Sequence, residues 1–344
     1  MPNNHPEEPR PATVAVTDFH PASTPTEASL VSRRTALQLM DLSRTVPSGT
    51  DAPSTEQVAI RACDALIDGY RMHALVAGAG APVVLVHGLL GAAAAWMPVM
   101  RVLAREATVY AVDAIGIGQS ERVRGIDGSL QASARRLALW MDHAGLERVD
   151  LVGTSHGGAV AMCFAAMFPQ RVRSLLLHAP ANPFCMQSQP QIRFAGTRIG
   201  RRVAHWLPAA PSWVHQAALC RMYGDPTRVR AGSLEEYVES LRRPGTVEYI
   251  LSVLRHWVPD MTALVPMLPR LRKLPTMLLW GAQDRAVSLS SAWRLRAVLR
   301  APLEILPELG HLPFEEAPEL FADRILRFVA DTAGRASVVP LRTA

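Results

Sequence analysis

Three polar residues that could do chemistry together each come soon after an apolar, strand-like segment. Ser155 comes after VDLVG, Asp284 after TMLLWG and His311 after PLEIL. Because parallel strands present their carboxyl ends along one edge of a sheet, we expect these three side chains to meet there. A serine hydroxyl becomes a useful nucleophile when a base accepts its proton and a third group orients that base. The chain order of serine, acid and histidine therefore predicts a catalytic triad.

The serine lies in a Gly-x-Ser-x-Gly pattern, Gly153-Thr154-Ser155-His156-Gly157, between a strand pattern and a helix pattern. A turn this tight brings neighbouring side chains onto the backbone, which favours glycine on both sides. Its use is to raise the serine Oγ above the sheet at the positive end of the helix. An ordinary strand–helix turn with a capping serine is the alternative. The flanking strand and helix patterns favour the nucleophile.

The base and the acid each have competitors. Of the eleven histidines, only His311 falls in a loop after a late strand; an ordinary surface histidine is the alternative interpretation. Asp113, in VDAIGIGQS, also ends a strand and is the rival acid. The chain order favours Asp284. We expect Asp113 to hold its own glycine-rich loop together.

The charge that develops during attack on a carbonyl needs two hydrogen-bond donors about 3 Å from the oxyanion. The His156 backbone N–H at the helix start is one candidate donor. The loop His87-Gly88-Leu89-Leu90-Gly91 would supply the other, and the Leu89 N–H is the candidate. A merely flexible loop is the alternative. We also take His87 and Gly88 as candidate substrate contacts.

The elements around these residues indicate an α/β fold. Strand and helix patterns alternate over residues 58–181 and 266–334, with a hairpin at Asp68-Gly69, and predict a mostly parallel sheet covered on both faces. Residues 182–265 are helical in pattern throughout and are predicted to form a lid, or cap. Residues 1–57 predict a mostly disordered tail with one short helix near Thr35–Leu42, and residues 335–344 a C-terminal tail.

Composition excludes several classes of protein. Hydrophobic residues make up 49% of the 344 residues and charged residues 19%, which is typical of a globular chain. The formal charge of +6 is scattered arginine, so a solvated surface is favoured over nucleic-acid binding. The four cysteines are far apart, which favours reduced thiols and a cytoplasmic location. Ser32-Arg33-Arg34 lacks the apolar stretch of an export signal, and no apolar run predicts a membrane span. No metal or nucleotide cofactor is expected.

Five segments together resemble one family. HGLLG, DAIGIGQS, GTSHGG, WGAQDRAV and ELGHLP, in this order, resemble the α/β-hydrolase fold superfamily from about Cys63 to Ala333. The likeness is greatest to lid-bearing esterases and to C–C hydrolases of meta-cleavage products. It implies an eight-stranded sheet with the lid after the sixth strand. It also implies Ser155, Asp284 and His311 as the triad, with the Leu89 and His156 amides as oxyanion hole.

The resemblance leaves the substrate open. Leu89, Leu90 and the four alanines that follow Gly91 suggest an apolar acyl pocket, so hydrolysis of a small, largely apolar carboxylic ester is the leading hypothesis. Epoxide hydrolases of this fold have an aspartate at the elbow, so serine disfavours that chemistry. Trp280 and Arg285 also resemble the C–C hydrolases, in which Arg193 would bind a substrate carboxylate; Trp280 is a further candidate contact. Perhydrolysis or acyl transfer, a non-catalytic receptor, and a homodimer also remain open.

Overall fold

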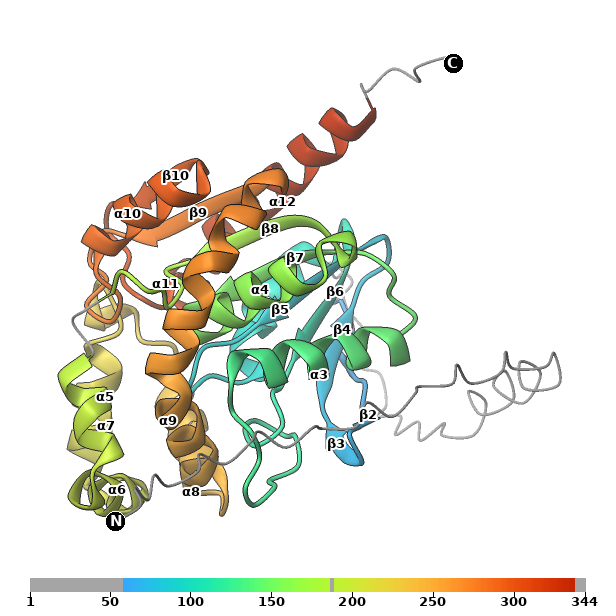
Figure 1. Cartoon of the computed structure of the whole chain (residues 1–344). Helices are drawn as coiled ribbons and strands as arrows, with labels where there is room; N and C mark the ends of the chain where they lie inside the picture. Colours follow the sequence, from blue (N-terminus) through green and yellow to red (C-terminus); the bar gives the residue numbers. More distant parts are fainter. Residues whose placement is uncertain (1–57, 186–188, 338–344) are drawn as a thin grey trace, which may run out of the picture. The chain divides into compact units, whose positions relative to one another are not determined.

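The computed structural model describes residues 58–185 and 189–337, all within the unit Glu56–Ala344 (Figure 1). The predicted N-terminal tail, with its short helix near Thr35–Leu42, lies outside the described residues. So does the predicted C-terminal tail beyond Ser337. The last helix, α12 (Pro318–Ser337), continues three residues past the predicted end of the folded region at residue 334.

The main sheet has eight strands in the order β1-β4-β6-β5-β7-β8-β9-β10. All neighbours from β6 to β10 pair in parallel, whereas β1 and β4 add two antiparallel pairings at one edge. The mostly parallel, eight-stranded sheet predicted from sequence is confirmed. Its strands are β1 (Arg61–Ala62), β4 (Ala74–Ala77), β5 (Ala81–Val86), β6 (Ala107–Val112), β7 (Val149–Thr154), β8 (Val172–His178), β9 (Thr276–Gly281) and β10 (Leu303–Leu306).

Helices cover both faces of this sheet. Successive residues of the central strands enter two different hydrophobic clusters: in β5, for example, Val84 packs in one and Leu85 in the other. The first cluster lies under α3 (Leu130–His143), α4 (Ser155–Met167) and α10 (Leu289–Leu299). The second lies under α2 (Met97–Leu103), α11 (Pro313–Glu316) and α12. Burial on both faces explains why these strands are continuous apolar runs in the sequence.

The predicted hairpin at Asp68-Gly69 is present as a separate two-stranded sheet of β2 (Ala65–Ile67) and β3 (Tyr70–Met72). The two turn residues have φ angles of 53° and 81°. Positive φ at both central positions is the geometry of a type I′ turn, which explains the Asp-Gly pair.

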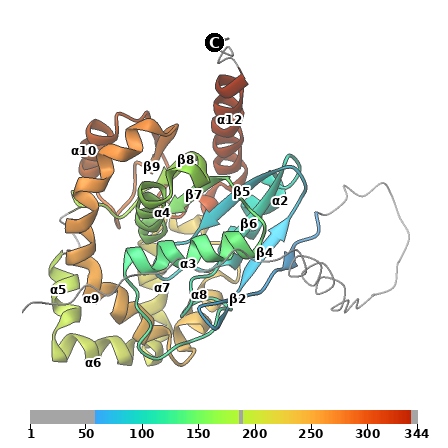
Figure 2. The same ribbon diagram turned by 45° about the vertical axis from the view of Figure 1, so that its right-hand side comes forward.

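The chain between β8 and β9 forms an insertion that is largely helical (Figures 1 and 2). The core was predicted to resume at residue 266. In the structure, the 3₁₀ helix η5 extends from Val265 to Lys273, and the next core strand, β9, begins at Thr276. Leu268 and Leu271 of η5 are buried in the core cluster next to α4, so η5 packs with the core. The elements are α5 (Gln189–Gly196), α6 (Arg198–Trp206), η3 (Leu207–Ala209), α7 (Ser212–Cys220), η4 (Pro226–Arg228), α8 (Ser233–Arg242), α9 (Thr246–Leu264) and η5 (Val265–Lys273).

Two further predictions concern the environment of the chain. All four cysteines are unpaired in the structure. Among the described helices, none combines the length and the apolar character needed to cross a membrane.

Candidate active site

Ser155 is the first residue of α4 and has a φ of 53°, a conformation that residues other than glycine rarely adopt. A Cβ on Gly157 would lie 2.2 Å from the His87 carbonyl oxygen, and one on Gly153 would lie 2.7 Å from the Gly157 oxygen. The start of α4 is therefore pressed against the neighbouring loop, and only glycine fits on either side. The backbone has the tight turn that the Gly-x-Ser-x-Gly pattern predicts.

The acid and the base are in direct contact. His311 Nδ1 lies 2.7 Å from Asp284 Oδ2, and the other carboxylate oxygen accepts the backbone N–H groups of Ala286 and Val287 at 2.8 and 2.9 Å. The Asp284 side chain has no exposed surface. Burial acts to raise the pKa of this carboxyl, but the charge and hydrogen bond of His311 and the Val287 N–H outweigh burial and lower it. Asp284 is thus an ionised carboxylate that orients the imidazole.

The serine lies on the same side of the sheet as this pair. Thr154 Oγ1, one residue before Ser155, lies 2.9 Å from Nδ1 of His178, and the His178 ring is 6.0 Å from the His311 ring, centre to centre. Within the described residues, no hydrogen bond joins Ser155 Oγ to His311. Such contacts are often long without substrate and tighten in the complex. The structure thus joins two members of the predicted triad and leaves the third bond unmade.

The loop after β5 passes directly over the serine. A Cβ on Gly88 would lie 3.1 Å from Ser155 Cβ and 3.6 Å from its Oγ. Leu89 follows in this loop, and His156 occupies the first turn of α4, where backbone N–H groups have no partner within the helix. These positions are compatible with the two predicted oxyanion donors.

A family model described as the alpha/beta hydrolase fold matches residues 81–318. The chain belongs to the α/β-hydrolase fold family. It is 31% identical over 242 residues to a 2-hydroxy-6-oxo-2,4-heptadienoate hydrolase of Pseudomonas putida, a match that covers 68% of this chain and 83% of that protein.

Solved structures share the fold at lower identity. A 2-hydroxy-6-oxo-6-phenylhexa-2,4-dienoate hydrolase from Rhodococcus matches with a TM-score of 0.68 and 24% identity, over 79% of this chain and 99% of that one. An epoxide hydrolase matches with a TM-score of 0.69 and 23% identity, over 79% and 99% of the two chains. Two of these three relatives are thus hydrolases of dienoates, and the third is an epoxide hydrolase.

Trp280 of this α/β hydrolase supports the acid and has no surface for a substrate, so the predicted contact is wrong. Its side chain is 0% exposed, and its indole N–H donates to the Val287 carbonyl at 3.0 Å. Val287 in turn donates its backbone N–H to Asp284. Trp280 therefore holds the loop that carries the carboxylate.

His87 was also predicted to contact substrate. In the structure, both nitrogens of its ring lie within hydrogen-bond distance of backbone groups. Nδ1 lies 2.7 Å from the Gly88 carbonyl oxygen, and Nε2 accepts the Ala114 N–H at 3.2 Å. Both ring nitrogens thus hold the loop after β5, which we call the oxyanion loop because it carries the candidate donor Leu89. The His87 ring therefore has a positioning role, and its contact with substrate stays a prediction.

The His156 side chain packs against the insertion. It stacks on Trp257 of α9 with ring centres 6.2 Å apart. Burial, and then the charge of His87, lower the pKa of His156 to about 4, so the ring is neutral near pH 7. Its backbone N–H, in the first turn of α4, stays the candidate oxyanion donor.

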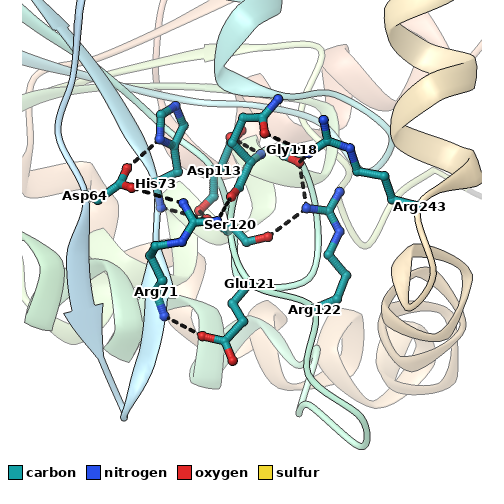
Figure 3. A network of polar contacts seen from close by, with 10 residues as sticks. Asp64, Arg71, His73, Asp113, Gly118, Ser120, Glu121, Arg122 and Arg243 are labelled. Atoms are coloured by element: carbon teal, nitrogen blue, oxygen red, sulfur yellow. Dashed lines mark hydrogen bonds and ion pairs between the residues drawn. The ribbon is translucent and has the colours of Figure 1, made fainter.

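Asp113 has the loop-holding role predicted for it. Its carboxylate accepts the Ala93 N–H at 2.6 Å and the Gln119 N–H at 2.7 Å. Figure 3 shows the network that continues from this loop: Arg122 and Arg243 both donate to the Gly118 carbonyl. Because Arg243 directly follows α8, this contact ties the insertion to the core.

A second attachment of the insertion lies at the histidine loop, and the sequence analysis missed it. The His311 backbone N–H donates to the Met222 carbonyl at 2.6 Å. The Glu316 carboxylate accepts the N–H groups of Gly224 at 2.9 Å and Gly310 at 2.8 Å. A Cβ on Gly310 would lie 2.3 Å from the Gly224 nitrogen, so the two segments touch backbone to backbone.

Beside it lies a buried polar cluster around Glu315, whose side chain is 0% exposed. Its carboxylate accepts the hydroxyls of Tyr223 at 2.6 Å, Ser233 at 2.6 Å and Tyr237 at 3.0 Å. Arg230 Nε lies 3.6 Å away. The only signal in the sequence is a pair of glutamates shortly after His311.

The remaining predicted contact, Arg193, lies exposed on α5 and makes no described contact with the triad. A cavity of about 220 Å³ opens between α8 and the oxyanion loop, lined by Leu90, Ala92, Tyr237 and others; a smaller one of about 40 Å³ is lined by His87 and His156. Neither is lined by the triad residues. In the described part of the chain, no group of three or more His, Cys, Asp or Glu is placed to hold a metal.

Proposed function

We propose that this α/β hydrolase cleaves a carboxylic ester of a small, largely apolar substrate through an acyl-enzyme. One observation carries the proposal. A serine in a strained turn at the start of α4 shares the strand-end edge with a buried Asp284–His311 pair. A serine in a strained turn, half-buried and at the same strand-end edge as an oriented imidazole, is the arrangement from which nucleophilic acyl transfer can proceed.

In the proposed reaction, His311 Nε2 accepts the Ser155 Oγ proton as the oxygen attacks the carbonyl carbon. The resulting oxyanion accepts hydrogen bonds from the Leu89 and His156 N–H groups. Collapse of this intermediate breaks the ester bond, and His311 returns the proton to the leaving alcohol. Water then attacks the acyl-enzyme by the same route and releases the acid. Asp284 stabilises the imidazolium at both stages.

The insertion after the sixth strand of the main sheet would act as a lid that selects the substrate. The cavity of about 220 Å³ beside Leu90, the residue after the proposed donor Leu89, offers space for an apolar group. Its wall includes Ala92, Ala94 and Ala95, three of the four alanines that follow Gly91, together with charged residues of α8. Gly88, packed against Ser155, leaves room there for the acyl carbon.

A second candidate reaction is C–C bond hydrolysis of a diketone acid. It is favoured by the Pseudomonas putida hydrolase, to which the chain is 31% identical. The same triad would serve, and exposed Arg193 would bind the substrate carboxylate from the insertion. Arg193→Gln should then raise KM for a diketone acid and leave KM for an uncharged ester unchanged.

The decisive experiment is hydrolysis of p-nitrophenyl acetate and butyrate by wild-type and Ser155→Ala protein. We expect kcat to fall by roughly 10⁴- to 10⁶-fold. Ser290→Ala, at an exposed serine of α10, is the matched control and should keep the wild-type rate. A Ser155→Ala protein with wild-type activity would refute the assignment. A far higher kcat/KM for a ring-fission diketone acid than for every ester would replace ester cleavage by the second candidate.

A further inference from the structure

Helix α6 is the least buried helix of the insertion. Of its residues only Gly200 is buried, and a Cβ there would lie 1.9 Å from the Phe194 carbonyl oxygen of α5. The helix thus rests on α5 through its glycine and exposes most other side chains. In both views it lies at the edge of the insertion furthest from the sheet (Figures 1 and 2).

The exposed side of α6 carries an apolar stripe. Ile199, Val203 and Trp206 are 68%, 42% and 54% exposed, and their spacing of four and three residues puts them on one helix face. Leu207 continues the stripe, and Phe194 of α5 is exposed as well. Exposed large apolar side chains grouped in this way mark interaction surfaces. We call Ile199, Val203, Trp206 and Leu207 the α6 stripe.

Arginines flank the stripe without acidic neighbours in sequence. Arg198, Arg201 and Arg202 are all exposed on the same helix. The sequence has no aspartate or glutamate between Asp150 and Asp225. Within the described residues, the insertion arginines that form ion pairs are Arg228, Arg230 and Arg243, all beyond this stretch. The α6 surface is therefore both apolar and positively charged.

The combination of apolar and positively charged side chains on α6 favours one class of binding partner. An apolar stripe beside arginines, with a tryptophan at its end, is the pattern of a helix that lies in the interface of a lipid bilayer. Arginine guanidinium groups bind phosphate oxygens in pairs of parallel hydrogen bonds. Anionic headgroups match the uncompensated charge, and the acyl region matches the stripe. We propose that α6 docks this protein onto an anionic lipid surface, independently of the reaction at Ser155.

The test is sedimentation of the full chain with vesicles. We expect binding to equimolar phosphatidylcholine and phosphatidylglycerol, weakening with added salt, and far weaker binding to phosphatidylcholine alone. Arg201→Gln with Arg202→Gln should weaken binding to the anionic vesicles roughly thirtyfold. Trp206→Ser should also weaken it. Ser155→Ala protein should bind like wild type, which separates this inference from the proposed function.

Matched controls lie on other helices. Arg101→Gln with Arg105→Gln removes two exposed arginines with the same charge change from the region of α2, and Trp293→Ser removes an exposed tryptophan from α10. Hydrolysis of a water-soluble ester should be unchanged in every binding variant, which shows that it is folded. The inference is overturned if anionic vesicles do not bind the protein or if the controls weaken binding as much as the α6 variants. It is also overturned if the chain is a dimer that Trp206→Ser dissociates.

Discussion

Two parts of the insertion differ in how they meet the rest of the molecule. The anchored segment, Met222–Arg243, is bonded to the histidine loop through Glu315 and Glu316 and to the Asp113 loop through Arg243. The exposed segment, Gln189–Leu207, contains the α6 stripe and its arginines. One part is thus held by buried polar groups that bond to the core, whereas the other presents unmatched charge and apolar surface.

This difference separates two roles within one insertion. The anchored segment helps to hold the loop of His311, because that residue's own backbone N–H is bonded to Met222. Any opening of the insertion that leaves the histidine in place must therefore move the exposed segment more than the anchored one. Substitutions in the anchored segment should consequently affect catalysis and stability, whereas substitutions in the exposed segment should affect surface binding.

The largest effect is expected at Glu315. In Glu315→Ala the buried hydroxyls of Tyr223 and Ser233 and the half-buried hydroxyl of Tyr237 lose their acceptor, which should lower the free energy of unfolding by about 3–5 kcal/mol. The histidine loop should loosen, and kcat for ester hydrolysis should fall with it. Urea unfolding and kcat measure the two effects. Glu315→Gln keeps an acceptor and should lose less; a Glu315→Gln protein as impaired as the alanine variant would contradict this account.

Gly310→Ala should have the next largest effect. Its Cβ would lie 2.3 Å from the Gly224 nitrogen, so the anchored segment and the histidine loop must part. We expect a loss of about 2–3 kcal/mol in unfolding free energy and at least a tenfold lower kcat. Gly196→Ala is the matched change in the exposed segment, because a Cβ there meets no atom within 4 Å. If both variants behave alike, the two segments are not distinct.

Acid should weaken the packing between the core and α9 and leave the α6 arginines charged. The pKa of buried His156 is about 4, against an ordinary value of 6.5. Between these values the unfolded chain binds more protons than the folded one, so stability falls as pH falls. From pH 6.5 to 5 the loss is about 2 kcal/mol for this residue. His156→Phe removes this titration and should reduce the pH dependence of urea unfolding, whereas buried His178, whose pKa is lowered to about 3, keeps its own contribution. An unchanged slope would exclude His156 as a source.

The smallest stability effects belong to the exposed segment. Gly196→Ala should stabilise by about 0.5–1 kcal/mol, because alanine loses less backbone freedom in a helix than glycine. Trp206→Ser should change the unfolding free energy by no more than about 0.5 kcal/mol, since the side chain is largely exposed. Thermal or urea unfolding checks both. A large loss in Trp206→Ser would mean that the stripe is covered within the chain.

The sequence predicted those features that depend on neighbouring residues. The sheet was predictable because its buried strands are apolar runs, and the turn at Ser155 because only glycine fits beside it. Asp113 was assigned correctly because its loop is local. The error at Trp280 has another cause: sequence shows that the side chain lies near the site, whereas the orientation of its ring is set by the Val287 carbonyl, seven residues away. The same holds for Glu315, whose partner Tyr223 is 92 residues away.

The Glu315 cluster also constrains how proteins of this fold can exchange parts. Suppose that residues 182–265 alone were replaced by the insertion of another protein. Glu315 and Glu316 would then lose Tyr223, Ser233 and Gly224 as hydrogen-bond donors. The incoming helices would leave the buried Glu315 carboxylate unmatched, four residues after His311. A working chimaera must therefore carry Gly310–Glu316 along with the insertion, so the unit of recombination in this protein is two separate stretches of sequence.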